Sequence, residues 1–255
     1  MDSPIRWAGG KKWLLPYFNA LVTGVKYNAF VELFAGGAAL SFGREETNVV
    51  LNDINTPLMR MYYHLHKGTL QQHIQASAEE YYVIRERYNA TKRSQGRSYE
   101  PQYASDFYFL NQYGFNGLYR ENSSGDFNVP YGKRTHVKLK DLGKYRTLMQ
   151  KWILANHDYA NLQLAADDLV FADPPYDGTF TDYSAGGFSW DDQERLATIL
   201  SRAPCPVVAT NAATPAILEM YKDLGFNLRT LEAPRRISRN GDRTPALEML
   251  AWRNF

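Results

Sequence analysis

Short apolar segments that stop at glycine, proline or an acidic residue recur along this chain of 255 residues. Runs of this length, bounded by turn residues, are typical of strands that are covered on both faces. Helical segments separate several of them, which predicts an α/β fold. Residues 30–40 are expected to form a strand, a glycine turn and a helix, and further strands are expected at 49–55, 169–172, 206–210, 229–231 and 247–252.

Helical patterning begins at Leu14, dominates residues 57 to about 90, and returns at residues 142–153. The aromatic-rich segment 106–113 is predicted to form a buried helix. Residues 92–98 are polar and contain glycine, which indicates a loop.

Two turn regions are predicted to form hairpins. Residues 118–120 and 127–129 flank an Asn-Ser-Ser-Gly turn, and residues 235–243 form a basic tip with an Asn-Gly turn. Exposed aromatic and arginine side chains on the first ribbon suit groove reading and wedge insertion into DNA. A small hairpin packed by its own aromatic rings is the structural alternative.

The strand at 169–172 ends at Asp173-Pro174-Pro175-Tyr176, which is the strongest candidate for chemistry. Each proline keeps the residue before it out of the helical region and donates no hydrogen bond, so the chain leaves the sheet stiffly. The carboxylate and the Pro174 carbonyl can accept the two hydrogens of an amine on a planar ring, while Tyr176 stacks on that ring. The nitrogen lone pair would then point at an electrophile. A rigid polar turn without chemistry is the alternative.

Paired glycines mark two more candidate ligand contacts. Gly9 and Gly10 stand before the first helix, and Gly36 follows a strand in the first turn of a Rossmann-like unit, where glycine allows close approach of a ligand. Asp53 lies 17 residues beyond Gly36, near the spacing of an acid that binds ribose hydroxyls. Without the full G-x-G-x-x-G pattern, a nucleoside-bearing cofactor is favoured over a nicotinamide one. For Asp53 a helix cap is the alternative.

The net charge of +2 conceals an uneven distribution. Residues 81–146 hold 12 Lys and Arg against 6 Asp and Glu, whereas the rest of the chain holds 17 against 21. A basic middle suggests a polyanionic partner that binds there. A solvated charged surface would give the same balance.

Composition excludes several classes of site. Cys205 is the only cysteine, which rules out internal disulfides and cysteine-rich zinc sites, and its place between two prolines indicates a structural role. The five histidines show no metal-ligand spacing. No apolar run approaches a membrane span, and the N-terminus has no signal-peptide pattern. We therefore expect a cytoplasmic protein without a metal or a membrane partner.

Six motifs occur in the order found in the DNA adenine methyltransferase (Dam) family, the D12 class, which carries an Asp-Pro-Pro-Tyr motif. One such motif could arise by chance, but six in order across nearly the whole chain are strong evidence. The chain therefore resembles this family of amino-methyltransferases. The motifs are Arg-Trp-Ala-Gly-Gly-Lys at 6–11, Glu-Leu-Phe-Ala-Gly-Gly at 32–37, Asn-Asp-Ile-Asn at 52–55, Gly-Phe-Asn-Gly-Leu-Tyr-Arg at 114–120, Phe-Asn-Val-Pro-Tyr-Gly-Lys-Arg at 127–134 and Asp-Pro-Pro-Tyr at 173–176.

The resemblance implies a Rossmann-like core that uses S-adenosylmethionine, with an inserted helical target-recognition domain that carries a β-hairpin. Residues 1–56 and 147–255 would form the discontinuous catalytic domain, which binds S-adenosylmethionine. Residues 57–146 would form the DNA-binding domain, where the basic excess lies. The target adenine must leave the duplex, because its amino group is inaccessible in the base stack.

The resemblance also assigns residues to the cofactor and the target adenine. Asp53 would bind the ribose hydroxyls, Asp158 and Tyr159 match positions that line the adenine pocket, and Asp173 would also lie near the amino group of the cofactor. The implied catalytic residues, which hold the flipped adenine, are Asp173, Pro174, Pro175 and Tyr176. The implied cofactor-binding residues are Trp7, Ala8, Gly9, Lys11, Phe34, Ala35, Gly36, Gly37, Asp53, Ile54, Asp158, Tyr159 and Asp173.

For the bases, the resemblance implies that Arg120 contacts a guanine and that Leu118 and Pro130 lie beside a thymine methyl. Both pairings are physically sensible, because arginine can bind guanine with two hydrogen bonds and apolar side chains contact the thymine methyl. These assignments predict GATC as the recognition site.

Four further positions are implied to contact DNA. Phe115 would be the wedge that fills the space left by the flipped base, and Asn116 would support the orphaned partner base. Arg6 and Arg134 occupy DNA-contacting positions that vary within the family. The departures at Phe115, Arg6 and Arg134 bear mainly on the outer base pairs of the site.

Two other functions fit parts of the pattern. Another planar amine, such as cytosine N4 or a protein glutamine amide, would suit the same tetrapeptide, but the motif order, the recognition insertion and Asp instead of Asn at position 173 argue against both. A non-enzymatic DNA-binding module would have to keep Asp173, Pro174, Tyr176 and Asp53 without using them. We expect a site-specific adenine-N6 methyltransferase of double-stranded DNA. As most relatives are monomers, a monomer is expected, with a dimer on DNA as the alternative.

Overall fold

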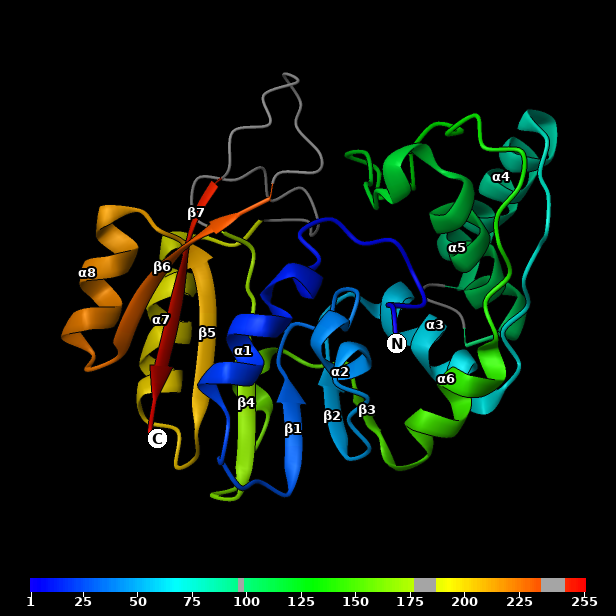
Figure 1. The fold of residues 1–255 in the computed structure, drawn as a ribbon. Helices are drawn as coiled ribbons and strands as arrows, with labels where there is room; N and C mark the ends of the chain where they lie inside the picture. The colour runs from blue at the N-terminus through cyan, green and yellow to red at the C-terminus, as the bar shows by residue number, and fades with distance from the viewer. Residues whose placement is uncertain (96–98, 177–186, 235–245) are drawn as a thin grey trace.

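A computed structural model describes residues 1–95, 99–176, 187–234 and 246–255 (Figure 1). The hairpin tip predicted at 235–243 and residues 96–98 of the predicted loop lie outside these ranges. Among the described residues, no helix combines the length and the apolar character that crossing a membrane requires.

The described strands form one seven-stranded sheet in the order β3-β2-β1-β4-β5-β7-β6. Strands β1 to β5 pair in parallel, and β7 runs antiparallel between β5 and β6. Because the two halves of the sheet start at the adjacent strands β1 and β4, the carboxyl ends of these strands flank the switch point where α/β sheets bind ligands. The strands are β1 Ala29–Glu32, β2 Val49–Asn52, β3 Ile153–Ala155, β4 Asp168–Ala172, β5 Val207–Ala212, β6 Asn227–Ala233 and β7 Ala246–Arg253.

Helices flank this sheet, and several begin with the expected capping groups (Figure 1). Ser189 and Asp192 form a reciprocal capping box at the start of α7, and the side chain of Thr214 caps α8 ahead of a proline at its first position. The α-helices are α1 Leu15–Leu21, α2 Ala39–Gly43, α3 Thr56–Lys67, α4 Ala78–Gln95, α5 Pro101–Tyr113, α6 Leu142–Leu148, α7 Trp190–Ser201 and α8 Pro215–Asp223. The 3-10 turns are η1 Lys11–Leu14, η2 Phe115–Gly117, η3 Met149–Lys151 and η4 Tyr159–Asn161.

Side chains of the central strands alternate between two apolar clusters, one on each face of the sheet. On one face Phe30 and Phe171 pack edge-on against Phe18 of α1, with ring centroids 5.8 and 5.6 Å away. On the other face Val31 belongs to a cluster with Leu196 of α7. Burial on both faces explains why these strands are continuous apolar runs in the sequence, and the strand predictions at 169–172, 206–210, 229–231 and 247–252 are confirmed.

The connection between the parallel neighbours β2 and β3 spans residues 53–152 and contains helices α3 to α6. These helices lie beside the β3 edge of the sheet, and the N-terminal segment runs between them and α1 (Figure 1). Their packing is rich in aromatic rings; those of Tyr88 and Tyr103 stack with centroids 4.6 Å apart. The apolar cluster they form is continuous with that of one sheet face. The division into domains 1–56 with 147–255 and 57–146 stays a prediction.

The helical pattern at 57–90 is interrupted. Helix α3 ends at Lys67, where Gly68 adopts a φ of 75° as the C-cap, and α4 begins only at Ala78. Glycine in the left-handed region is a common way to end a helix. Helix α4 then continues to Gln95, so the loop prediction is wrong for residues 92–95. The buried helix predicted at 106–113 is confirmed as part of α5.

Two predictions for residues 118–153 are corrected. The helix predicted at 142–153 ends at Leu148, and Ile153–Ala155 is strand β3 instead. Its three apolar residues continue the helical pattern, so no local signal separates them. The segments predicted as hairpin strands at 118–120 and 127–129 run antiparallel, with the Asn128 N–H bonded to the Arg120 carbonyl at 3.1 Å, but they form isolated bridges, Glu121 to Phe127 and Gly114 to Tyr131, and not regular strands. Main-chain bonds to the side chain of Asn122 hold this turn in place of a regular ladder.

Candidate active site

Asp173 lies at the carboxyl end of β4, and its contacts fix one of its two carboxylate oxygens. Lys11 Nζ lies 3.1 Å from Oδ1, and the Thr210 hydroxyl donates to the same oxygen at 2.7 Å. Thr210 reaches this position because β4 and β5 pair with Ala172 opposite Ala209. Within the described part of the chain, Oδ2 takes no hydrogen bond and remains available to a ligand.

The two prolines that follow present their carbonyls differently. The Pro175 carbonyl accepts a hydrogen bond from Gln193 Nε2 at 2.9 Å, and Gln193 is itself held by Asn211 at 2.8 Å. The Pro174 carbonyl has no such donor among the residues that the structure describes. An acidic oxygen and a carbonyl on neighbouring residues are therefore the two acceptors that this turn offers to an incoming amine.

Tyr176 closes the turn with its hydroxyl anchored to a carboxylate. The hydroxyl donates to Glu248 Oε2 at 2.6 Å, and Lys11 Nζ lies 4.6 Å from the centroid of the ring. Burial and the neighbouring carboxylates Asp173 and Glu248 raise the pKa of Tyr176 well above its usual value. Tyr176 thus stays a neutral hydroxyl, with a ring suited to stacking.

Asp53, directly after β2, lies beside the glycine turn that follows β1. Its Oδ2 accepts the Gly36 N–H at 3.0 Å and its Oδ1 accepts the Asn55 N–H at 2.8 Å. Burial raises the pKa of Asp53, and these two hydrogen bonds oppose the shift. Each oxygen keeps a further lone pair for a hydroxyl donor. The next residue, Ile54, is 60% exposed, so it offers an apolar surface beside the acid.

Trp7 packs so closely on the glycine turn that a side chain at Gly36 would force the Trp7 ring to shift. A Cβ on Gly36 would lie 2.9 Å from Trp7 Cδ1, and the φ of Gly36 is +44°. A Cβ on Gly37 would lie 3.3 Å from Trp7 Cβ. The other face of the aromatic system reaches the helical part of the chain, because Trp7 stacks on Tyr119 at 6.2 Å. The structure therefore brings together Trp7, Gly36 and Gly37, three of the residues predicted to bind the cofactor.

A second group of aromatic rings lines the approach to this turn. The ring of Phe34 lies 5.3 Å from that of Tyr159 and 5.9 Å from that of Phe188. Asp158, the residue before Tyr159, forms an ion pair with Arg195 at 3.0 Å. Phe188 and Arg195 were not predicted from the sequence. Phe188 precedes α7 and Arg195 lies within it, and no recognisable motif includes either residue. Ala8 and Gly9 lie next to Trp7 in the chain, and Ala35 is buried beside Phe34.

Glu32, the last residue of β1, is a buried carboxyl that the sequence did not single out. It is 2% exposed, and it accepts a hydrogen bond from the Ser41 hydroxyl at 2.5 Å. Burial raises the pKa of Glu32 to about 8, and the negative charge of Asp173 adds to the shift. The carboxyl therefore keeps its proton in the folded chain across a range where the unfolded chain would lose it.

This pKa predicts a loss of stability with rising pH. Between the usual glutamate pKa and about 8 the folded state binds more protons than the unfolded state, so the free energy of unfolding falls as pH rises. The Glu32→Gln variant should lose this dependence, which amounts to roughly a few kcal/mol. Urea unfolding of both proteins at pH 5 and pH 8.5 measures it, with the exposed Glu219→Gln as control. Parallel pH dependences of wild type and Glu32→Gln would contradict the role of Glu32.

The predicted DNA-contacting residues gather on the segment between α5 and α6. The Phe115 N–H donates to the Pro130 carbonyl at 2.9 Å, and Gly114 bridges Tyr131, so the two ends of the segment lie side by side. Phe115 is 50% exposed. Asn116 adopts a φ of 54°, a left-handed conformation that asparagine tolerates. The predicted wedge and its neighbour thus stand on a rigid, exposed turn.

Arg6 joins this surface from the N-terminal segment. Its N–H donates to Asn111 Oδ1 at 3.0 Å, and Asn111 Nδ2 donates back to its carbonyl at 2.6 Å. A Cβ on Gly117 would lie 2.5 Å from Arg6 Cβ, so the glycine allows this contact. Burial and the charge of Arg134 lower the pKa of Arg6, because the two guanidinium groups lie near each other.

Arg120 is exposed, and a neighbouring side chain holds one nitrogen of its guanidinium. Its Nε donates to Asn128 Oδ1 at 2.7 Å, and the paired terminal donors of the guanidinium form no hydrogen bond with a described residue. Leu118 is partly buried beneath it and Pro130 is exposed. Of the other described basic residues in this part of the chain, Arg87, Lys92 and Arg93 form ion pairs with acids; Lys92 pairs with Glu121 at 2.6 Å, for example.

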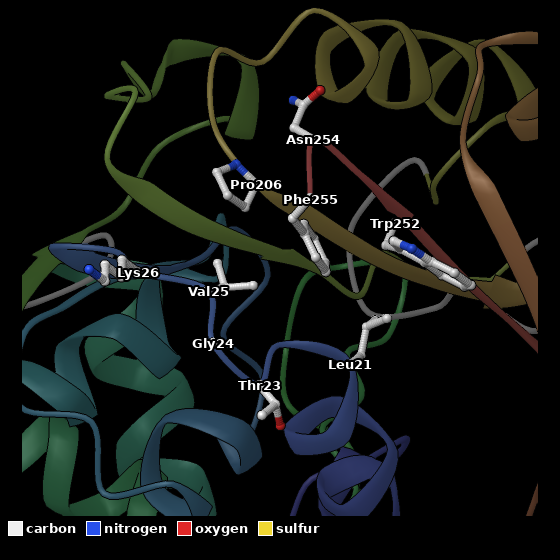
Figure 2. Close-up of a pocket in the computed structure, with 9 residues that line it drawn as sticks. All are labelled: Leu21, Thr23, Gly24, Val25, Lys26, Pro206, Trp252, Asn254 and Phe255. Carbon is white, nitrogen blue, oxygen red and sulfur yellow. The ribbon is translucent and has the colours of Figure 1, made fainter.

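A surface hollow lies away from the candidate site. A shallow hollow of about 610 Å³ is lined by the loop after α1, by Pro206 before β5 and by the end of β7 (Figure 2). These segments stand at the amino ends of the parallel strands, opposite Asp173, and the hollow has no chemical connection to the candidate site. Among the described residues, no group of three or more His, Cys, Asp or Glu side chains could hold a metal ion.

Comparison with known proteins agrees with the fold and the site. A family model for D12 class N6 adenine-specific DNA methyltransferases matches residues 7–237. A type II methyltransferase of Lactococcus lactis subsp. cremoris is 32% identical over 90% of this chain and 87% of its own. The Retron Ec67 DNA adenine methylase of Escherichia coli is 31% identical over 98% of this chain and 91% of its own. The DNA adenine methylase of Escherichia coli strain K12 is 31% identical over 93% and 89%.

A parallel sheet with an antiparallel β7 and an acidic, proline-bounded end of β4 defines a Rossmann-like methyltransferase, which confirms the α/β, Rossmann-like core of the predicted fold class. The inserted recognition domain stays a prediction. The chain belongs to the D12 class N6 adenine-specific DNA methyltransferases.

Proposed function

We propose that this chain transfers a methyl group from S-adenosylmethionine to N6 of an adenine flipped out of duplex DNA, in the sequence GATC. The observation that supports this proposal most directly is the set of hydrogen-bond acceptors in the turn after β4. Lys11 and Thr210 both hold Asp173 Oδ1, whereas Oδ2 and the Pro174 carbonyl accept no bond from the described residues. Two neighbouring acceptors match the two hydrogens of an exocyclic amine.

The residues around the first glycine turn fit S-adenosylmethionine as the methyl donor. Gly36, with a φ of +44° and Trp7 packed against it, keeps the turn close to Asp53, and Asp53 keeps lone pairs for two ribose hydroxyls. The rings of Phe34 and Tyr159 offer faces and edges for an adenine. When bound, the donor supplies an electrophilic methyl group on a positively charged sulfur. Lys11, Trp7 and the turn would orient it.

The protein's contribution to the reaction is orientation and electrostatics. Asp173 Oδ2 and the Pro174 carbonyl would each hold one N6 hydrogen, so that the lone pair leaves the plane of the adenine and faces the methyl carbon. Tyr176 would stack on the base from the side. The N6 proton becomes acidic only once the nitrogen is methylated, and Asp173 is then the nearest acceptor for it.

Recognition of the duplex would come from the turn between α5 and α6 together with Arg6. Phe115 would fill the gap left by the flipped adenine, with Asn116 beside the orphaned base. Arg120 would read a guanine through its two terminal nitrogens, and Leu118 and Pro130 would contact a thymine methyl. Arg6 and Arg134, which lie near each other, would add phosphate or outer-base contacts.

The test is transfer of labelled methyl from S-adenosylmethionine to two unmethylated duplexes, one with GATC and one with that site scrambled. Label on the GATC duplex alone, recovered as N6-methyladenine, is the expected result. Label on both duplexes would contradict the assignment of the recognition turn but keep the chemistry. Label recovered as N4-methylcytosine would contradict the target, and no label despite cofactor binding would favour an inactive DNA-binding module.

A further inference from the structure

Strand β7 brings an acidic side chain to the candidate active site from far along the chain. In register, Glu248 lies opposite Ala212 of β5 and Leu231 of β6. Its side chain is 13% exposed, and its Oε2 accepts the hydroxyl hydrogen of Tyr176 at 2.6 Å across 72 residues of sequence. The contact depends on the antiparallel placement of β7 next to β5, which no motif of the sequence encodes.

Among the described residues, Lys11 is the positively charged neighbour of this carboxylate. Lys11 Nζ lies 3.7 Å from Glu248 Oε2 and 3.1 Å from Asp173 Oδ1, with its own side chain 6% exposed. A carboxylate this far from water needs a partner to remain charged. Burial raises the pKa of Glu248, and Lys11 and Tyr176 oppose that shift. Lys11 therefore keeps Glu248 available as an acceptor.

We propose that Glu248 is a positioning residue for methyl transfer, which fixes the Tyr176 ring through its hydroxyl so that the target adenine stacks where its amine meets the Asp173 carboxylate. The inference rests on the proposed function. Tyrosine has two side-chain torsions, and an anchor at its hydroxyl determines the plane of the ring. A stacked base copies that plane, and small errors in the position of a reacting atom cost rate.

The experiment is single-turnover methyl transfer to a GATC duplex by Glu248→Leu, which keeps the volume but removes both oxygens. We expect a rate roughly tenfold or more below wild type, the size expected when a hydrogen bond to a charged group is lost. Glu248→Gln keeps an acceptor oxygen for Tyr176 and should recover part of the rate. Glu232→Gln, on the exposed side of the adjacent strand β6, is the matched control and should transfer at the wild-type rate.

A double-mutant cycle separates positioning from support of the fold. Tyr176→Phe keeps the stacking ring but lacks the hydroxyl, so Glu248→Leu should cost little further rate in the Tyr176→Phe background. Additive losses, or a wild-type rate in Glu248→Leu alone, would overturn the inference and leave the proposed function standing. Failure of the wild-type protein to label any duplex would instead overturn the proposed function, which makes the two failures distinguishable.

Discussion

The Asp173→Ala variant should transfer methyl groups on the order of 10³-fold more slowly than the wild type while it still binds duplex DNA. The carboxylate supplies one of the two acceptors that would turn the adenine amine toward the methyl donor, and no other acid of the described site can take its place. Glu248 is tied to Tyr176, and Glu32 is buried under the turn with a raised pKa. Among the described residues, the segment between α5 and α6 that is proposed to contact DNA forms no hydrogen bond or ion pair with this carboxylate, so DNA affinity should persist.

Three measurements make this prediction specific. Thermal unfolding of Asp173→Ala checks the fold, because Lys11 loses an ion pair but keeps Glu248 at 3.7 Å. Asp173→Asn retains an acceptor oxygen and should retain more activity than the alanine variant. The matched control is Asp167→Ala, which removes an exposed acid beside the opposite end of β4 and should transfer normally. Near-normal turnover of Asp173→Ala in a folded protein would contradict the proposed role.

The strands that build this site could be predicted because burial of their central residues leaves short, mainly apolar runs in the sequence. The end of β4 was also recognisable, since two successive prolines donate no hydrogen bonds to a neighbouring strand and stop the ladder there. Asp53 and Gly36 stood at a spacing that the fold explains directly. The Asp53 carboxylate accepts the Gly36 N–H at 3.0 Å. The spacing is therefore the length of chain that leaves the glycine turn, forms α2 and β2, and returns to the same edge of the sheet.

The side chains that the sequence did not reveal are placed by pairing between distant strands. Thr210 meets Asp173, and Glu248 meets Tyr176, only because β5 lies between β4 and β7 in one particular register. A local pattern carries no information about that register. An acid in the apolar segment 247–252 was the one available signal for Glu248, because a charged residue inside a buried strand calls for a partner.

The turn between α5 and α6 shows a different limit of sequence patterns. Its aromatic residues suggested strands, yet the structure holds it with side-chain bonds of Asn122 and with ion pairs from α4, such as Arg93 to Asp126 at 2.8 Å. Asparagine, serine and glycine compete with ladder bonding wherever their side chains reach the backbone. The excess of Lys and Arg in residues 81–146 is likewise partly structural. Lys92 and Arg93 form ion pairs that support this turn, whereas Arg120 is exposed on it.

Arg120→Ala should relax sequence discrimination at one guanine by about 1–3 kcal/mol, roughly a fivefold to 150-fold change in the preference for GATC over a duplex altered at that base. Asn128 binds Nε at 2.7 Å and so leaves the two terminal nitrogens for a base edge. A bidentate contact of this kind favours guanine over other bases because only guanine offers two acceptors at that spacing in the major groove.

Comparison of kcat/KM on GATC and on duplexes with one base pair replaced at a time identifies the base that Arg120 reads. Arg120→Lys should resemble the alanine variant in discrimination, because an ammonium group cannot reproduce the paired donors of a guanidinium. Lys222→Ala, which removes one exposed positive charge on α8, controls for net charge and should leave discrimination unchanged. An equal loss on every duplex, with a shallower salt dependence of binding, would instead mean that Arg120 contacts a phosphate.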